Sequence, residues 1–205
     1  MNIKICGITN KEDALDAVSL GADALGFIFH KPSPRYISPE KVEEIVMFLP
    51  PFIHVVGVFV NNSKEDIEEI VDRCRLNLIQ LHGEESPQFC MEMPRRVIKA
   101  TRVSEPDDLL SITQYQGVVS SILLDTKVKG VYGGTGKTFD WGLALEAKEY
   151  DTPLILSGGI NANNIEKALK MVGPYGIDIC SGVEKEPGIK DYNKMQELIG
   201  AIKTS

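Results

Sequence analysis

The 205-residue sequence lacks the patterns of several large protein classes. It has no excess of basic residues: the formal net charge is −7, whereas a general nucleic-acid or membrane-surface role needs a basic face. No apolar run approaches the roughly 20 residues that span a membrane, and no basic-then-apolar leader opens the segment MNIKICGIT. We therefore expect a cytoplasmic protein without nucleic-acid, membrane or obligate protein partners.

Metal-binding and nucleotide-binding signatures are also missing. None of the four cysteines belongs to a C-x-x-C pair, so neither a zinc site nor a redox motif is indicated, and disulfides are not expected in the cytoplasm. No G-x-G-x-x-G follows the first strand-like run, and Gly136-Lys137-Thr138 ends like a P-loop but has Val131 where the first glycine belongs. We expect no metal and no cofactor.

What the chain does have is a regular alternation of strand and helix patterns. Apolar runs indicate eight strands, at 3–6, 24–29, 54–60, 78–82, 97–100, 121–125, 154–156 and 177–180. Helical patterns follow them near 11–20, 39–48, 64–74, 87–93, 106–115, 140–148, 162–171 and 191–202. This alternation predicts a parallel sheet, and eight units in this length favour one (β/α)₈ (TIM) barrel domain over residues 1–205. A doubly wound open sheet is the alternative.

Two glycine turns follow consecutive strands near the end of the chain. The run 154–156 stops at Ser157-Gly158-Gly159, and the run 177–180 stops at Ser181-Gly182. Backbone N–H groups in such turns, beside a helix N-terminus for which Asn161 is a candidate cap, can close around an anion. One turn alone can be a simple connection, but the pair favours a phosphate grip.

Catalytic groups of a barrel lie at the C-terminal ends of its strands, which here include Cys6, His82 and Asp125. A thiolate at Cys6 would be a competent base if its pKa were lowered, although a free cysteine is often only a small apolar residue. Asp125 should face the barrel interior with Leu123, where a carboxylate must be solvated, paired or used. His82 can orient a substrate or hydrogen-bond a neighbouring loop.

Two cationic residues complete this interpretation. Arg35 lies on a proline-stiffened loop and could bind a substrate carboxylate, although a solvated surface arginine is the simpler reading. Lys4 shares a strand face with Cys6, and Asp178 should occupy the neighbouring strand once the barrel closes. We expect Lys4 and Asp178 to pair inside the barrel, because either charge alone would be uncompensated there.

Seven segments occur in the order expected of one known family: KICGIT, KPSPRYI, IQLHGEE, LLDTK, GGTGKTFDW, LSGGI and DICSGVE. Over essentially its whole length the chain resembles phosphoribosylanthranilate isomerase of tryptophan biosynthesis. KICGIT and GGTGKTFDW are specific to the resemblance, whereas SGG and SGVE are shared by many phosphate-binding barrels.

The resemblance implies a cofactor-free Amadori rearrangement of N-(5-phosphoribosyl)anthranilate to 1-(2-carboxyphenylamino)-1-deoxyribulose 5-phosphate. It makes Asp125 the acid that opens the furanose ring and Cys6 the base that removes the C2 proton. Substrate binding falls to Arg35, His82, Gly134, Thr135, Gly136 and Asp178, and phosphate binding to Gly158, Gly159, Ser181 and Gly182. The alternatives are another phosphosugar isomerase or epimerase and a non-catalytic phosphosugar-binding barrel.

Overall fold

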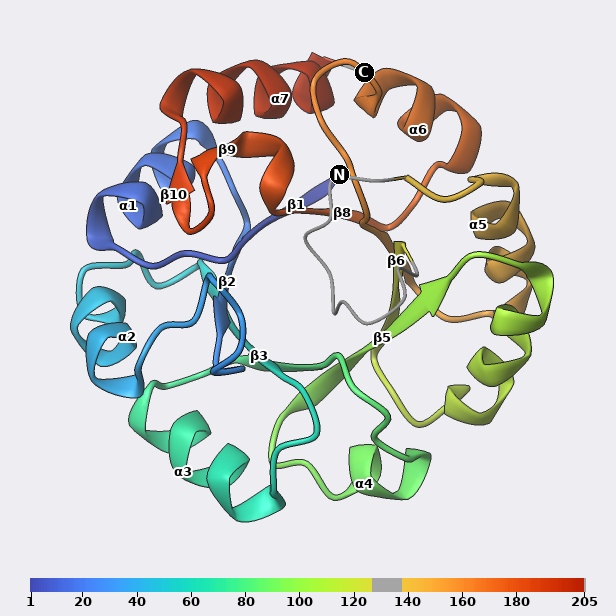
Figure 1. Cartoon of the computed structure of the whole chain (residues 1–205), viewed down its shortest axis with the longest axis horizontal. Coiled ribbons are helices and arrows are strands. Elements are labelled where there is room, and N and C mark those ends of the chain that lie inside the picture. The colour runs from blue at the N-terminus through green and yellow to red at the C-terminus, as the bar shows by residue number, and fades with distance from the viewer. Residues whose placement is uncertain (127–137, 205) are drawn as a thin grey trace.

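The computed structural model describes residues 1–126 and 138–204, and its centre is a closed ring of eight parallel strands surrounded by helices (Figure 1). The strands are β1 (Asn2–Cys6), β2 (Ala24–Ile28), β3 (His54–Phe59), β4 (Leu78–Leu81), β5 (Arg96–Val103), β6 (Ser121–Thr126), β7 (Leu154–Leu156) and β8 (Gly176–Ile179). Strand β8 pairs in parallel with β1, which closes the ring. The predicted barrel is confirmed and the open sheet is excluded.

The helices lie where the sequence predicts them, with one change of type. They are α1 (Lys11–Leu20), α2 (Pro39–Val46), α3 (Lys64–Arg73), α4 (Pro87–Met91), α5 (Gly142–Ala147), α6 (Ile165–Val172) and α7 (Tyr192–Thr204). The segment after β5 is a 3₁₀ helix, η1 (Pro106–Tyr115), and a short 3₁₀ turn, η2 (Lys148–Tyr150), extends α5. Each helix packs an apolar face against the outside of the barrel.

One predicted helix start needs correction. Helix α6 begins at Ile165 with Asn164 at its N-cap, because Asn161 opens a preceding turn whose carbonyl accepts the N–H groups of Asn164 and Ile165. Asn161 is therefore not the cap. The turn at 161–164 separates the N-terminus of α6 from Gly158 and Gly159. The backbone N–H groups near these glycines therefore belong to the loop and not to the first turn of the helix.

The apolar core has two parts, and strand β6 illustrates both. Leu123 packs inside the barrel with Val56, Ile98, Ala100 and Ile155. Its neighbours Ile122 and Leu124 belong to the larger core between barrel and helices. Since side chains alternate along a strand, Asp125 shares the inner face with Leu123, as the sequence predicts.

A small polar hairpin follows β8 and was not predicted. It consists of a 3₁₀ turn η3 (Ser181–Val183) and two antiparallel strands, β9 (Glu184–Glu186) and β10 (Ile189–Lys190). The hairpin lies inside the ring of helices, beside α1 and α7 (Figure 1). It brings two charged residues, Glu184 and Lys190, to the C-terminal mouth of the barrel.

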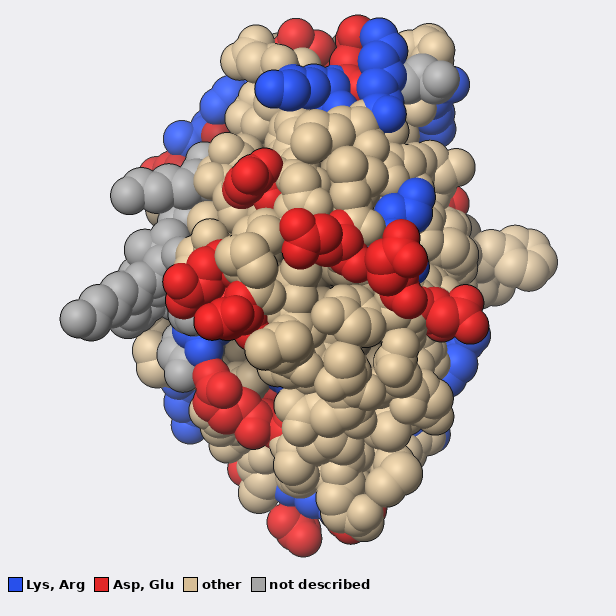
Figure 2. Space-filling view, turned by 90° about the vertical axis from the view of Figure 1, so that its right-hand side faces the viewer, with Lys and Arg blue, Asp and Glu red and all other residues tan. Residues whose placement is uncertain are grey.

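The outer surface agrees with the acidic composition. On the side shown in Figure 2, Asp and Glu side chains lie scattered over the middle, and Lys and Arg gather toward the upper edge. Within the described residues, no helix combines the length and apolar character needed to cross a membrane.

Candidate active site

Two cavities lie at opposite ends of the barrel, and ionisable groups line more of the smaller one. The larger, about 400 Å³, lies at the N-terminal end; its walls are largely apolar, and Asp23, His54 and Arg96 lie at its exposed rim. The smaller, about 60 Å³, lies at the C-terminal end and is lined by Cys6, Arg35, Gln80, His82, Asp125, Ser157, Asp178 and Cys180. Because catalytic groups of such barrels lie at the C-terminal ends of the strands, we assign the active site to the smaller cavity.

Cys6 lies at the end of β1 beside a buried ion pair. Lys4 Nζ lies 2.7 Å from a carboxylate oxygen of Asp178 on β8, and both side chains are almost fully buried. This confirms the pair predicted from barrel closure. The ammonium group of Lys4 also lies beside the Cys6 side chain, and each of the two groups favours the charged form of the other. On β2, Gly26 leaves room for both groups, since a Cβ there would lie 2.7 Å from Cys6 Sγ.

The surroundings of Cys6 favour its thiolate. A hydrogen bond from Cys180 and the positive charge of Lys4 together outweigh burial and lower the pKa of Cys6 from 9.0 to about 6. The pKa of Cys180 is raised well above its usual value, first by the hydrogen bond to Cys6 and then by burial. At neutral pH the arrangement is a thiolate at Cys6 and a thiol at Cys180.

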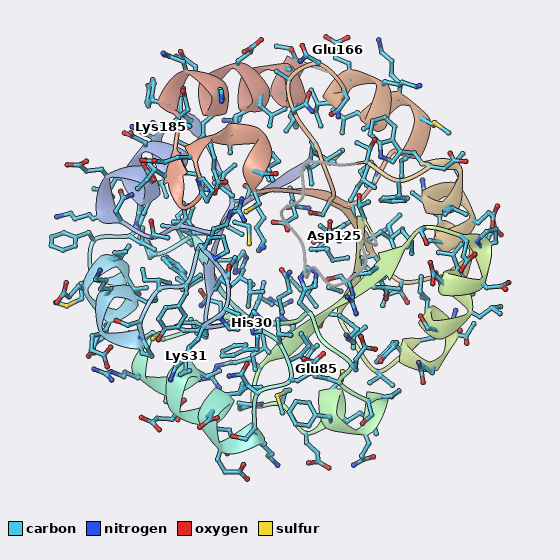
Figure 3. All side chains as sticks on the ribbon, viewed as in Figure 1. His30, Lys31, Glu85, Asp125, Glu166 and Lys185 are labelled. Atoms are coloured by element: carbon cyan, nitrogen blue, oxygen red, sulfur yellow. The ribbon has the colours of Figure 1, made fainter. Side chains whose placement is uncertain are left out.

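Asp125 is the penultimate residue of β6 and lies within the ring of strands (Figure 3). One of its carboxylate oxygens accepts the N–H of Thr126 at 2.8 Å. The other lies 3.3 Å from His82 Nε2, without the alignment of a hydrogen bond. The Gln80 side-chain nitrogen lies 3.1 Å from His82 Nδ1. Since an amide nitrogen only donates, Nδ1 accepts, and we assign the ring proton to Nε2, facing the cavity.

Arg35 is buried, with 8% of its surface exposed, so the solvated-arginine reading is excluded. Its Nε and Nη2 hold the Glu184 carboxylate at 2.7–3.1 Å. Lys190 Nζ lies 2.9 Å from the same carboxylate and also donates to the Cys6 carbonyl. Gly7, with φ of 74°, leaves space for this arginine, because a Cβ there would lie 2.8 Å from Arg35 Cδ. The hairpin thus fixes the guanidinium over the cavity.

The two glycine turns differ in backbone, and only the first contains left-handed glycines. Gly158 and Gly159 have φ of 81° and 66°, a region that favours glycine. A Cβ at Gly182 would collide with the Ile160 carbonyl, so the turns after β7 and β8 pack against each other. Among the described residues, the structure assigns no hydrogen-bond partner to the N–H groups of Gly158 and Gly159.

The remaining residues that the sequence predicts for substrate and phosphate binding are the 134–136 loop, the second glycine turn and Asp178. Gly134, Thr135 and Gly136 lie outside the described residues. Ser181 begins η3 and, with Gly182, flanks the second turn. Asp178 lines the cavity, pairs with Lys4 and accepts from the Ser157 hydroxyl, and its role in substrate binding stays a prediction. Within 1–126 and 138–204, no three His, Cys, Asp or Glu side chains gather as a metal site would need.

Four residues of the site were not assigned by sequence reasoning: Gln80, Cys180, Glu184 and Lys190. Gln80 lies two residues before His82 on β4, so the period of a strand gives it the same face. Cys180 was recognised as a strand end but given no role. Glu184 and Lys190 depend on the hairpin, for which the sequence gives no strand pattern.

Comparison with known proteins agrees with this geometry. The family model of N-(5'-phosphoribosyl)anthranilate (PRA) isomerase matches residues 3–201. The N-(5'-phosphoribosyl)anthranilate isomerase of Geobacter metallireducens is 49% identical over 203 residues, covering 99% of each chain. The solved structure of phosphoribosyl anthranilate isomerase from Thermotoga maritima is 43% identical with a TM-score of 0.94, and all of each chain is covered.

A further solved structure of this isomerase holds reduced 1-(o-carboxyphenylamino)-1-deoxyribulose 5-phosphate; it is 42% identical, with a TM-score of 0.91 and full coverage of both chains. The match to the family model extends over nearly the whole chain, and so do these relatives. The chain belongs to the N-(5'-phosphoribosyl)anthranilate isomerase family.

Proposed function

We propose that this chain catalyses the Amadori rearrangement of N-(5-phosphoribosyl)anthranilate, with Cys6 as the general base and Asp125 as the general acid. The observation that carries the proposal is that a thiol with a lowered pKa and a buried carboxyl line one cavity at the C-terminal end of the barrel. The reaction needs these two groups, because it consists of two proton transfers to and from one sugar.

The first step opens the ribose ring. A proton from Asp125 goes to the furanose oxygen, the C1–O bond breaks, and the nitrogen lone pair forms an iminium ion. The Cys6 thiolate then takes the C2 proton, and the C–H electrons neutralise the iminium, which gives an enolamine. Tautomerisation of the enol gives the ketone product, so atoms and charge balance without another reactant.

Substrate orientation follows from the fixed charges around these two groups. Arg35 is held by Glu184 through Nε and Nη2, which leaves Nη1 to bind the anthranilate carboxylate. The N–H groups of Gly158 and Gly159, with Ser181 and Gly182, would bind phosphate at the β7 and β8 turns. The unpartnered side-chain atoms His82 Nε2 and Gln80 Oε1 are a donor and an acceptor for ribose hydroxyls.

The proposal extends to the conditions in which the enzyme works. A base that is a thiolate beside a second thiol requires reduced cysteines, which the cytoplasm maintains. We therefore place the chain in the cytoplasm, as one domain acting in tryptophan biosynthesis on a small anionic substrate.

The decisive experiment is an assay of the purified chain with N-(5-phosphoribosyl)anthranilate, coupled to the enzyme that consumes the carboxyphenylamino-deoxyribulose phosphate. We expect turnover that saturates with substrate and is inhibited competitively by inorganic phosphate. Substrate binding without conversion above the uncatalysed rate would leave a non-catalytic barrel. Conversion of a different phosphosugar in preference to this one would favour the isomerase or epimerase alternative.

A further inference from the structure

The thiol of Cys180 lies directly beside the thiol proposed as the base. Strands β1 and β8 pair in parallel with Lys4 opposite Asp178 and Ile5 opposite Ile179, so the next positions along the two strands are Cys6 and Cys180. Both side chains line the active-site cavity, and each thiol shifts the pKa of the other. Neighbouring parallel strands lie about 4.8 Å apart, which is the right spacing for two short side chains on the same face to touch.

The backbone around the two sulfurs is shaped to hold them. A Cβ at Gly7 would lie 3.1 Å from Cys180 Sγ, and a Cβ at Gly26 would lie 2.7 Å from Cys6 Sγ. Gly7 also has φ of 74°, which side chains other than glycine rarely adopt. Two glycines on different segments thus leave the space that this pair of thiols occupies.

Charged side chains face both sulfurs of the pair. Lys4 Nζ contacts Cys6, and Asp178 lies on the other side of Lys4. Lys190 from β10 and Arg35 from the loop after β2 act on Cys180, but Glu184 accepts hydrogen bonds from both of these cations. The cations on both sides are thus paired with carboxylates, and the direct contact with Lys4 stabilises a thiolate at Cys6 and leaves the proton of the pair on Cys180.

We propose that Cys180 is a positioning residue for the base: its S–H donates a hydrogen bond to the Cys6 thiolate and holds that sulfur, unprotonated, toward C2 of the substrate. This inference rests on the proposed role of Cys6. When Cys6 takes the C2 proton it no longer accepts strongly from Cys180, so the hydrogen bond stabilises the reactive state and weakens once the proton has been transferred. Cys180 itself exchanges no proton with the substrate.

The test compares three substitutions at one position. Cys180→Ser keeps a donor, Cys180→Ala removes it, and Cys180→Val removes it while filling similar space, which preserves the comparison if the alanine variant does not fold. The readout is the thiolate absorbance near 240 nm during a pH titration of the folded protein. Cys74 and Cys90 provide a quiet background, because burial raises the pKa of each to about 11.

We expect one thiolate to titrate near pH 6 in the unaltered chain and to vanish in Cys6→Ala, which identifies it. In Cys180→Ala or Cys180→Val the midpoint should rise by about one pH unit or more, since a hydrogen bond to the charged form is lost. Cys180→Ser should remain nearer the unaltered chain. The acid limb of kcat/KM against pH should move with the absorbance midpoint, whereas a merely structural role would change KM equally at every pH.

An unchanged midpoint in both donor-free variants would overturn the proposal. A thiolate that titrates near pH 6 in a chain without turnover would instead refute the proposed function and leave the hydrogen bond intact. The absorbance titration therefore tests the hydrogen bond from Cys180, and the assay tests the proposed function, each independently of the other.

Discussion

Two strands of the barrel each carry a buried lysine that pairs with a carboxylate and lies near a cysteine. On β1, Lys4 lies 2.7 Å from Asp178 and contacts Cys6. On β5, Lys99 lies 3.1 Å from Glu85 and acts on Cys90. The two cysteines respond in opposite ways: the pKa of Cys6 falls to about 6, and burial raises that of Cys90 to about 11.

The difference lies in what else each lysine binds. Lys99 Nζ also donates to the carbonyls of Leu81, Gly83 and Ala100, so its donors are consumed in holding the β4 loop in place. Lys4 has one carboxylate and one thiol as partners, and that thiol faces the cavity. A buried lysine therefore promotes chemistry only where one of its partners is itself ionisable and accessible to substrate.

The largest expected effect separates the two cysteines. Cys6→Ala should lower kcat roughly 10²–10⁴-fold, the usual contribution of a general base, and leave KM within a small factor because the carboxylate and phosphate contacts remain. Cys90→Ala should leave kcat unchanged. Steady-state kinetics of both purified variants measures this contrast; a Cys6→Ala enzyme with near-full turnover would require another base.

Asp125→Asn should lower kcat to a similar extent, since an amide cannot supply the proton that opens the ring. Its matched control is Asp140→Asn, which alters an exposed carboxylate two residues before α5 that does not line the cavity. KM should remain within a small factor in both variants. Normal turnover by Asp125→Asn would remove this residue from the acid role.

Replacement of Lys99 should change only the stability of the fold, whereas replacement of Lys4 should change both the stability and the pKa of Cys6. Lys99→Met leaves Glu85 buried without its partner and should cost about 3–5 kcal/mol of unfolding free energy. Lys4→Met should destabilise the fold by a comparable amount through Asp178, and should also raise the midpoint of the Cys6 titration. Urea unfolding and thiolate absorbance together report both effects. If Lys99→Met shifted the Cys6 midpoint as much as Lys4→Met does, the claim that Lys4 specifically lowers the pKa of Cys6 would be wrong.

The contact between Lys4 and Asp178 also shows how much of the site can be predicted from the sequence. Lys4 and Asp178 are 174 positions apart, yet their contact was predictable, because closure of eight strands places β8 beside β1 and the two-residue period sets the face. Arg35 and Glu184 are also distant, and their contact was not predictable. It depends on a hairpin of five strand residues that is too short and polar to give a periodic signal. Lys190, 2% exposed, reads from sequence as an ordinary surface lysine for the same reason.

Arg35→Ala should act on binding rather than on chemistry. The guanidinium is expected to contact the anthranilate carboxylate, and a hydrogen bond between charged groups contributes about 1.5–3 kcal/mol, so KM should rise roughly ten- to hundredfold while kcat changes little. Glu184→Gln keeps the arginine but loosens its anchor and should raise KM less. A variant of Arg35 that loses kcat at constant KM would contradict this division.

The smallest expected effect is the dependence of kcat/KM on pH in the unaltered enzyme. It tests most directly whether the pKa values of Cys6 and Cys90 differ. A base is active when deprotonated, so a pKa of about 6 at Cys6 leaves roughly nine tenths of the sites active at pH 7 and half at pH 6. Below that, kcat/KM should fall about tenfold per pH unit, whereas an ordinary thiol of pKa ~8.5 would already limit activity at pH 7.

Inactivation by iodoacetamide should follow the same midpoint, because the thiolate is the nucleophile, while Cys90 should stay unreactive until far higher pH. An acid limb centred above pH 8 would show that Lys4 and Cys180 do not lower the pKa of Cys6, and the contrast between the two buried lysines would then rest on stability alone.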